Sequence, residues 1–151
     1  MANLEAVRVV AQHWDLIAQG RRMEAAALAA DDFTNFGRRI GRSGIEVILR
    51  ALGEAFPDQR HEIVEMVSDG EEVTCRLIMR GTHLGQPSLP LVLGGVLAEV
   101  EPTGRRVEVD QIHMFRVRDG KISEHFAVRD DLGMGRQLGL LPEGPPGRRC
   151  W

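Results

Sequence analysis

The first third of the chain places apolar residues at the three- and four-residue spacing of amphipathic helices. This spacing predicts one helix over residues 3–19, an alanine-rich helix over 22–30, and a third over 44–56 that Pro57 ends. The stripe of the first helix is formed by Leu4, Val7, Val10, Ala11, Trp14, Ile17 and Ala18. Each helix would bury one side and therefore needs a partner surface elsewhere in the chain.

After Pro57 the pattern changes from helical spacing to alternation of apolar and polar residues. Alternation over 59–67 and 72–83 predicts one β-hairpin, and alternation over 106–117 and 121–130 predicts a second. Helices that precede antiparallel strands are typical of the α+β class. We expect three N-terminal helices to cover one face of a curved antiparallel sheet and to close a pocket against it.

The second hairpin carries the chemistry that the pattern suggests. Regular pairing around the turn at Asp119 and Gly120 sets His113 opposite Phe126 and Val109 opposite Asp130. One face of the hairpin is then mostly apolar, with a few polar groups, which suits a ligand cavity better than a dry core. That face comprises Val109, Gln111, His113, Phe115, Val117, Ile122, Glu124, Phe126, Val128 and Asp130.

Length and charge limit the classes of function. A chain of 151 residues fits a single domain, which we place at residues 1–141 with a tail at 142–151. The net charge of −3 and the scattered arginines argue against a nucleic-acid partner. Neither a signal peptide nor an apolar run of about 20 residues is apparent, so we expect no membrane partner and a cytoplasmic location.

Metal-binding residues are not grouped in the sequence. Cys75 lies in a predicted strand and Cys150 is next to last in the chain, and the five histidines are scattered. No His, Cys or carboxylate cluster has the spacing of metal ligands, so we expect no metal requirement.

Three segments together resemble the SnoaL-like polyketide cyclases of the nuclear transport factor 2-like superfamily. They are "AFPDQRHEI" (55–63), "RGTHLG" (80–85) and "PTGRRVEVDQIHMFRVRDGKISEHFAVRDDLGMGRQLG" (102–139). The resemblance implies an α+β cone fold and an intramolecular aldol condensation that closes a ring in a polyketide without any cofactor. It also implies an acid/base aspartate at the end of the last strand, which corresponds by motif to Asp130.

Asp130 is therefore the expected catalytic residue. One carboxylate can remove a proton next to a carbonyl and then protonate the new alkoxide if an apolar site raises its pKa. Its predicted neighbours Phe126 and Val128 would supply that site. The alternative is an exposed aspartate that caps the next turn, a role that Asp131 fits better.

Further side chains are expected around the substrate. His113 is the second catalytic candidate, because it could polarise a carbonyl or transfer a proton. The predicted substrate-binding residues are Asn35, His83, Gln111, Phe126, Phe115, Val128, Trp14 and Met79. For each polar member of this set, a structural role in the core or in a turn is the alternative.

Two other functions stay open at this point. The same aspartate could serve an epoxide hydrolase or a dehydratase, or the pocket could hold an apolar ligand without catalysis. The absence of tyrosine argues against sites of the ketosteroid isomerase or scytalone dehydratase type, which depend on tyrosine hydroxyls.

Two surfaces complete the expectations. Residues 84–104 form a long apolar segment with several Gly and Pro residues, which predicts either a lid over the substrate or a permanently packed element. The sheet face away from the helices would carry apolar residues among charged ones, so we expect a homodimer. These apolar residues are Ile63, Val67, Ile78, Ile112 and Met114.

Overall fold

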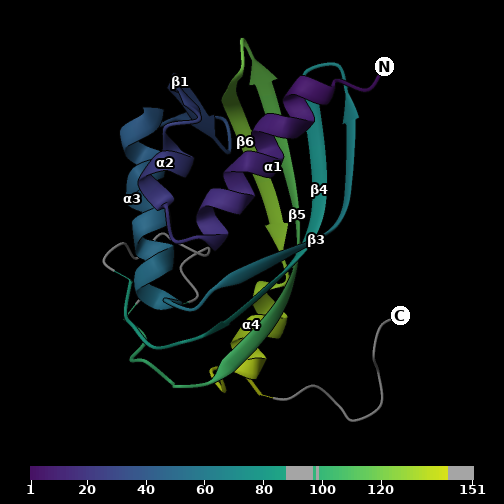
Figure 1. The fold of residues 1–151 in the computed structure, drawn as a ribbon. Helices are drawn as coiled ribbons and strands as arrows, with labels where there is room; N and C mark the ends of the chain where they lie inside the picture. The colour runs from purple at the N-terminus through teal and green to yellow at the C-terminus, as the bar shows by residue number, and fades with distance from the viewer. Residues whose placement is uncertain (88–96, 98, 143–151) are drawn as a thin grey trace.

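In the computed structural model, three helices cover one face of a curved six-stranded sheet, and a fourth follows the last strand and lies beside the first part of the strand before it (Figure 1). The structure describes residues 1–87, 97 and 99–142. The helices are α1 (Leu4–Ala18), α2 (Arg22–Ala26), α3 (Gly41–Ala55) and α4 (Asp131–Gln137). The strands are β1 (Ala29–Asn35), β2 (Arg38–Arg39), β3 (Arg60–Asp69), β4 (Glu72–Thr82), β5 (Arg106–Arg118) and β6 (Lys121–Arg129). The expected α+β cone is confirmed.

The strand order is β2-β1-β6-β5-β4-β3, and neighbouring strands are antiparallel except for β1 and β6. The parallel pair was not expected. It forms because β1, which follows α2, enters the sheet beside β6 and runs in the same direction as that strand. Pairing β1 with β6 brings Asn35 directly opposite His125.

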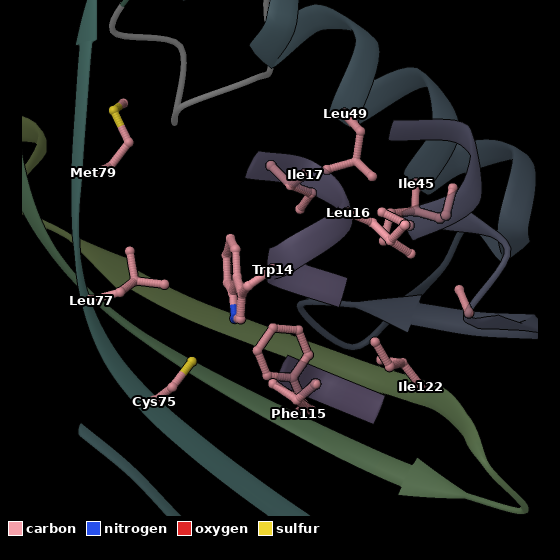
Figure 2. Close-up of a cluster of buried hydrophobic side chains, with 14 of the residues drawn as sticks. Trp14, Leu16, Ile17, Ile45, Leu49, Cys75, Leu77, Met79, Phe115 and Ile122 are labelled. Carbon is pink, nitrogen blue, oxygen red and sulfur yellow. The ribbon is translucent and has the colours of Figure 1, made fainter. Parts of the chain in front are cut away.

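The core lies between α1, α3 and the inner face of the sheet. Trp14 projects from α1 towards the sheet, where Cys75 and Phe115 lie close to its indole ring (Figure 2). Alternating side chains of β4 and β5 are buried along the whole length of both strands, as the period of two requires. Apolar helix stripes thus cover the inner face, and the outer face stays exposed.

The long segment after β4 is held at its base. The backbone N–H groups of Leu84 and Gly85 both donate to the carbonyl of Ala55, and Gly104 donates to the carbonyl of His83. Leu97 is fully buried in the core. The remainder of the expected lid, residues 88–96 and 98, lies outside the described residues, as does the tail from 143 onward.

Candidate active site

A cavity of about 550 Å³ lies between the helices and the inner face of the sheet. This volume is within the usual range of small-molecule sites. Its apolar walls come from α1, α3 and the sheet, through Trp14, Ile17, Ile45, Leu49, Met79 and Phe115. Its polar lining comes from α1, from the first residues of α2 and α4, from the end of β1, from the start of β3, from the middle of β5 and from the second half of β6.

A bulge in β6 decides which of its side chains face this cavity. Val117 pairs with Ile122, but Arg116 pairs with Glu124, so Ser123 is an extra residue on β6. The Ser123 hydroxyl donates to the carbonyl of Arg116 at 3.2 Å and holds the bulge. Because side chains alternate across a strand, one extra residue moves every later side chain to the other face.

The predicted register of β6 is therefore wrong beyond Ser123. His113 lies opposite Ala127 rather than Phe126, and Gln111 lies opposite Arg129. Phe126 points outward, is 42% exposed and contacts Phe36. Val128 borders the cavity, but it is 75% exposed. Phe126 therefore does not line the cavity, whereas Val128 lies at its border.

Asp130 and Asp131 have each other's expected roles, one in the cavity and the other as a helix cap. Asp130 is exposed and is the N-cap of α4, where its Oδ1 accepts a hydrogen bond from the Gly133 N–H at 2.8 Å. Asp131, expected to be the cap, lines the cavity. The expectation that Asp130 faces the pocket is wrong, because the bulge has turned the end of β6 over.

Asp131 lies in an environment that favours its neutral form. Burial raises the pKa of its carboxyl, and the nearby Asp130 adds to this, whereas Arg129 opposes it. Arg129 Nη2 donates to Asp131 Oδ2 at 3.3 Å. The other oxygen, Oδ1, is buried and has no hydrogen-bond partner among the described residues. One oxygen of Asp131 is thus held, and the other has an unused capacity to accept a hydrogen bond.

A hydrogen-bonded chain of four side chains crosses the floor of the cavity. Gln111 Oε1 lies 2.8 Å from His113 Nε2, and His113 Nδ1 lies 2.9 Å from His125 Nε2. His125 Nδ1 lies 2.8 Å from Asn35 Oδ1. All four residues line the cavity, and the chain links β5, β6 and β1.

The protonation of this chain follows from counting hydrogens. Burial lowers the pKa of His125 to about 3 and the pKa of His113 well below its usual value, and nearby histidine and arginine side chains add to both effects. Two neutral imidazoles supply two N–H donors for three hydrogen bonds. The third donor must therefore be an amide N–H of Asn35 or Gln111, since amide nitrogen and oxygen are assigned only from their surroundings. Every bond of the chain then points in one direction.

Trp14 stands between this chain and a further histidine. Its ring centroid lies 4.9 Å from that of His113 and 4.8 Å from that of His61 on β3. Burial lowers the pKa of His61 to about 4, with contributions from His13 and Arg22. His61 and Gln59 both line the cavity on the wall opposite β6.

Seven of the predicted site residues do meet in the cavity, namely Trp14, Asn35, Met79, Gln111, His113, Phe115 and, at its exposed border, Val128. His83 does not. It is fully buried at the base of the 84–104 segment, where its Nδ1 accepts a hydrogen bond from the Thr103 N–H at 3.2 Å. Its ring packs 5.7 Å from Phe56, so its position is that of a structural residue.

The sequence reasoning missed Arg22, Gln59, His61, His125, Arg129 and Asp131, which also line the cavity. His125 and Arg129 were assigned to the outer face because a regular hairpin was assumed, and Asp131 was assigned to the cap of the next turn. One signal was available in the sequence. A bulge in β6 would have placed a histidine, an arginine and an aspartate on the pocket face at alternate positions.

Among the described residues, no group of three His, Cys or carboxylate side chains is arranged to hold a metal ion. None of the described helices is long and apolar enough to cross a membrane.

The sequence model of the family described as SnoaL-like polyketide cyclase matches residues 5–138. The aklanonic acid methyl ester cyclase DnrD of Streptomyces peucetius is 37% identical over 97 residues, which are 62% of this chain and 60% of that protein. The nogalonic acid methyl ester cyclase of Streptomyces nogalater is 34% identical over 82 residues, 54% of each chain. The alignments thus span little more than half of these relatives.

Solved structures share the fold. TsrD from Streptomyces laurentii superposes with a TM-score of 0.76 and 21% identity, covering 93% of this chain and 99% of TsrD. A SnoaL-like polyketide cyclase from Agrobacterium tumefaciens superposes with a TM-score of 0.72 and 24% identity, covering 89% of this chain and 98% of that chain. At these identities the likeness establishes the fold alone.

Proposed function

Because this chain belongs to the SnoaL-like polyketide cyclase family, we propose that it closes a ring in a polyketide by a cofactor-independent intramolecular aldol reaction. We propose Asp131, rather than Asp130, as the acid/base. The observation that carries this assignment is the free Oδ1 of Asp131, buried in the cavity beside an oxygen that Arg129 holds.

The reaction needs a base that can also act as an acid. Asp131 Oδ1 would take a proton from the carbon between two carbonyls, and the resulting enolate would attack a ketone carbon of the same molecule. The new alkoxide would then take the proton back, so the reaction leaves the carboxylate as it began. A pKa raised by burial suits both steps, because it brings the acid and the base forms closer in energy.

Arg129 and the histidine chain would support the charges that develop. The Arg129 guanidinium lies beside the reacting carboxylate and could stabilise the enolate oxygen. His113 and His125 would act as positioning residues, because their ring nitrogens hold the amides of Gln111 and Asn35 in place. An amide N–H of either residue would then polarise the ketone that is attacked.

The assay distinguishes this function from its alternatives by mass. An aromatic β-keto ester with a second ketone within reach is incubated with the protein. Aldol closure leaves the mass unchanged and creates a new stereocentre, whereas epoxide hydration of a matched epoxide adds one water and dehydration removes one. Enzyme-dependent exchange of the α-hydrogen in D₂O would report proton abstraction even before ring closure. If there is neither exchange nor product, the pocket only binds its ligand.

We also propose that two copies associate through the outer face of the sheet. Exposed Val67, Ile112, Met114 and Phe126 share this face with exposed ion pairs such as Arg76–Asp110 and Arg80–Glu62. Ile63, expected here, pairs with the buried Leu77 and so belongs to the inner face. An apolar face of this kind is typical of subunit interfaces.

A further inference from the structure

Three residues that line one wall of the cavity each carry a buried nitrogen atom without a hydrogen-bond partner. The atoms are Arg22 Nε, Gln59 Nε2 and His61 Nδ1, and none has a partner among residues 1–87, 97 and 99–142. All three residues line the same cavity. Gln59 is only 6% exposed. Buried polar atoms are nearly always paired, so three orphans on one wall indicate a missing partner.

The chemistry of these atoms defines what is missing. Arg Nε and the amide nitrogen of Gln can only donate hydrogen bonds, and His Nδ1 donates in one of its two tautomers. The missing partner is therefore an acceptor. Within the described lining of the cavity, Asp131 is the carboxylate, and its Oδ2 is already held by Arg129. A ligand bound in the cavity would supply such an acceptor.

The fold prepares this wall for a guanidinium group. Arg22 is the first residue of α2, and its side chain lies against α3 at Gly53. A Cβ at position 53 would lie 2.6 Å from Arg22 Nε, so only glycine leaves room for the guanidinium there. Gln59 and His61 project from the start of β3 on the inner face, where His61 lies opposite Met79.

The charge of the lining favours an anion over a neutral acceptor. The cavity is lined by two guanidinium groups, Arg22 and Arg129, and by one carboxylate, Asp131. One positive charge therefore has no counterpart in the described lining. Hydrogen bonds from a guanidinium to an ionised oxygen are stronger than those to a neutral carbonyl, particularly away from water.

From this geometry we infer that Arg22, Gln59 and His61 form a subsite for the free carboxylate of an elongated, apolar substrate. The inference rests on the proposed function for the identity of that substrate as a polyketide. β3 is separated from β6 by three strand spacings, roughly 14 Å along the sheet. A substrate anchored at this wall would extend past Trp14 to Asp131. The named relatives act on methyl esters, so a free acid would be a different substrate.

Binding of two matched probes tests the subsite without any turnover. Calorimetry would compare anthraquinone-2-carboxylate with its methyl ester, which has the same rings but no charge. We expect the wild type to bind the acid about tenfold more tightly or better, the magnitude of one charge-assisted hydrogen bond. Arg22→Met should abolish this preference. Arg60→Met is the matched control, because Arg60 lies between Gln59 and His61 but is exposed on the outer face, and it should keep the preference.

A second variant guards against misfolding. Gly53→Ala keeps every charge and raises helix propensity, but its methyl group would displace the Arg22 guanidinium. It should lower the acid preference at least about threefold, since the hydrogen-bond geometry is lost. Equal binding of acid and ester by the wild type would overturn the subsite. So would a preference that survives both Gly53→Ala and a folded Arg22→Met.

The same measurements separate the subsite from the proposed function. Asp131→Asn should retain the preference for the acid, because Asp131 lies on the other wall. An acid preference without cyclisation by the wild type would leave the subsite standing and remove the cyclase proposal. Cyclisation of the methyl ester alone, with no preference for binding the acid, would support the cyclase proposal and remove the subsite.

Discussion

Asp130 and Asp131 are adjacent in the chain, yet the first caps α4 in solvent while the second faces the cavity and pairs with Arg129 at 3.3 Å. Their roles follow from the direction in which β6 ends. The N-cap residue must turn its side chain back to the backbone N–H of Gly133, and this leaves the first helical residue, Asp131, pointing inward. Two similar carboxylates thus have different environments within one peptide unit.

Asp131→Asn is expected to reduce turnover of a cyclisable β-keto ester by about 10²–10⁴-fold, since it removes the base but keeps the shape of the side chain. Asp130→Asn is the matched control. Asparagine still caps a helix, so we expect near wild-type turnover and little change in stability. Rates would be measured by product formation at saturating substrate. Turnover within about threefold of wild type in Asp131→Asn would exclude Asp131 as the acid/base.

His125→Leu should interrupt the hydrogen-bonded chain that positions Asn35 and His113. We expect kcat to fall by roughly tenfold with a smaller change in KM, because the chain orients groups that act in the transition state. Phe126→Leu, one residue further along β6 and exposed, is the control and should leave kcat unchanged. Equal effects of the two variants would argue that the chain has no part in turnover.

Acid should destabilise this protein because its histidines are buried as neutral rings. Burial lowers the pKa of His13 and His61 to about 4 and of His125 to about 3, and His113 follows the same direction. The unfolded chain binds these protons below about pH 6.5, so stability is full above that pH and is lost as pH falls towards 4. Each histidine contributes up to about 1.4 kcal/mol per pH unit in that window.

The raised pKa of Asp131 acts in the opposite direction, because the folded state binds its proton more readily than the unfolded chain. The protonation of Asp131 offsets the acid destabilisation from one histidine at most. Urea unfolding at pH 7.5, 6 and 5 would measure how the free energy of unfolding changes with pH. His13→Gln should reduce this slope by the amount that corresponds to about one bound proton. A free energy of unfolding that does not change between pH 7.5 and 5 would contradict the buried neutral state.

Deletion of Ser123 should be far more damaging than its replacement. Without the extra residue, β6 would pair regularly, bringing Phe126 and Val128 inward and turning His125 outward. We expect a loss of at least about 3 kcal/mol, or no folding, because a whole strand face is exchanged. Ser123→Ala removes only the hydrogen bond to Arg116 and should cost about 1 kcal/mol. Comparable stabilities of the two variants in urea unfolding would show that the bulge does not fix the register.

Dimer formation through the outer face of the sheet can be tested by measuring the molar mass in solution. Light scattering at micromolar concentration should give a dimer for the wild type and a monomer for Met114→Lys, which puts a charge among exposed apolar residues. Leu4→Lys is the control, because Leu4 is exposed on α1, away from this face. A monomeric wild type would remove the dimer proposal and leave the site unaffected.

The sequence by itself determined the elements and their class. Helical spacing located α1 and α3, and alternation located β3, β4, β5 and β6, because these periods follow from local backbone geometry and from the need to bury one face. It also identified His113, Gln111, Phe115 and Met79 as pocket residues, since β4 and β5 are regular throughout. Alternation alone is sufficient wherever the pairing has no irregularity.

Only the tertiary structure decided the chemistry at the end of β6. One extra residue at Ser123 reverses the faces of every side chain after it, and apolar–polar alternation does not locate such a bulge in a strand whose two faces both mix apolar and polar residues. The parallel pairing of β1 with β6 brought Asn35 to His125, and the packing of α2 on α3 brought Arg22 into the cavity. These contacts join residues far apart in the chain, and they depend on the whole fold being assembled rather than on any local pattern.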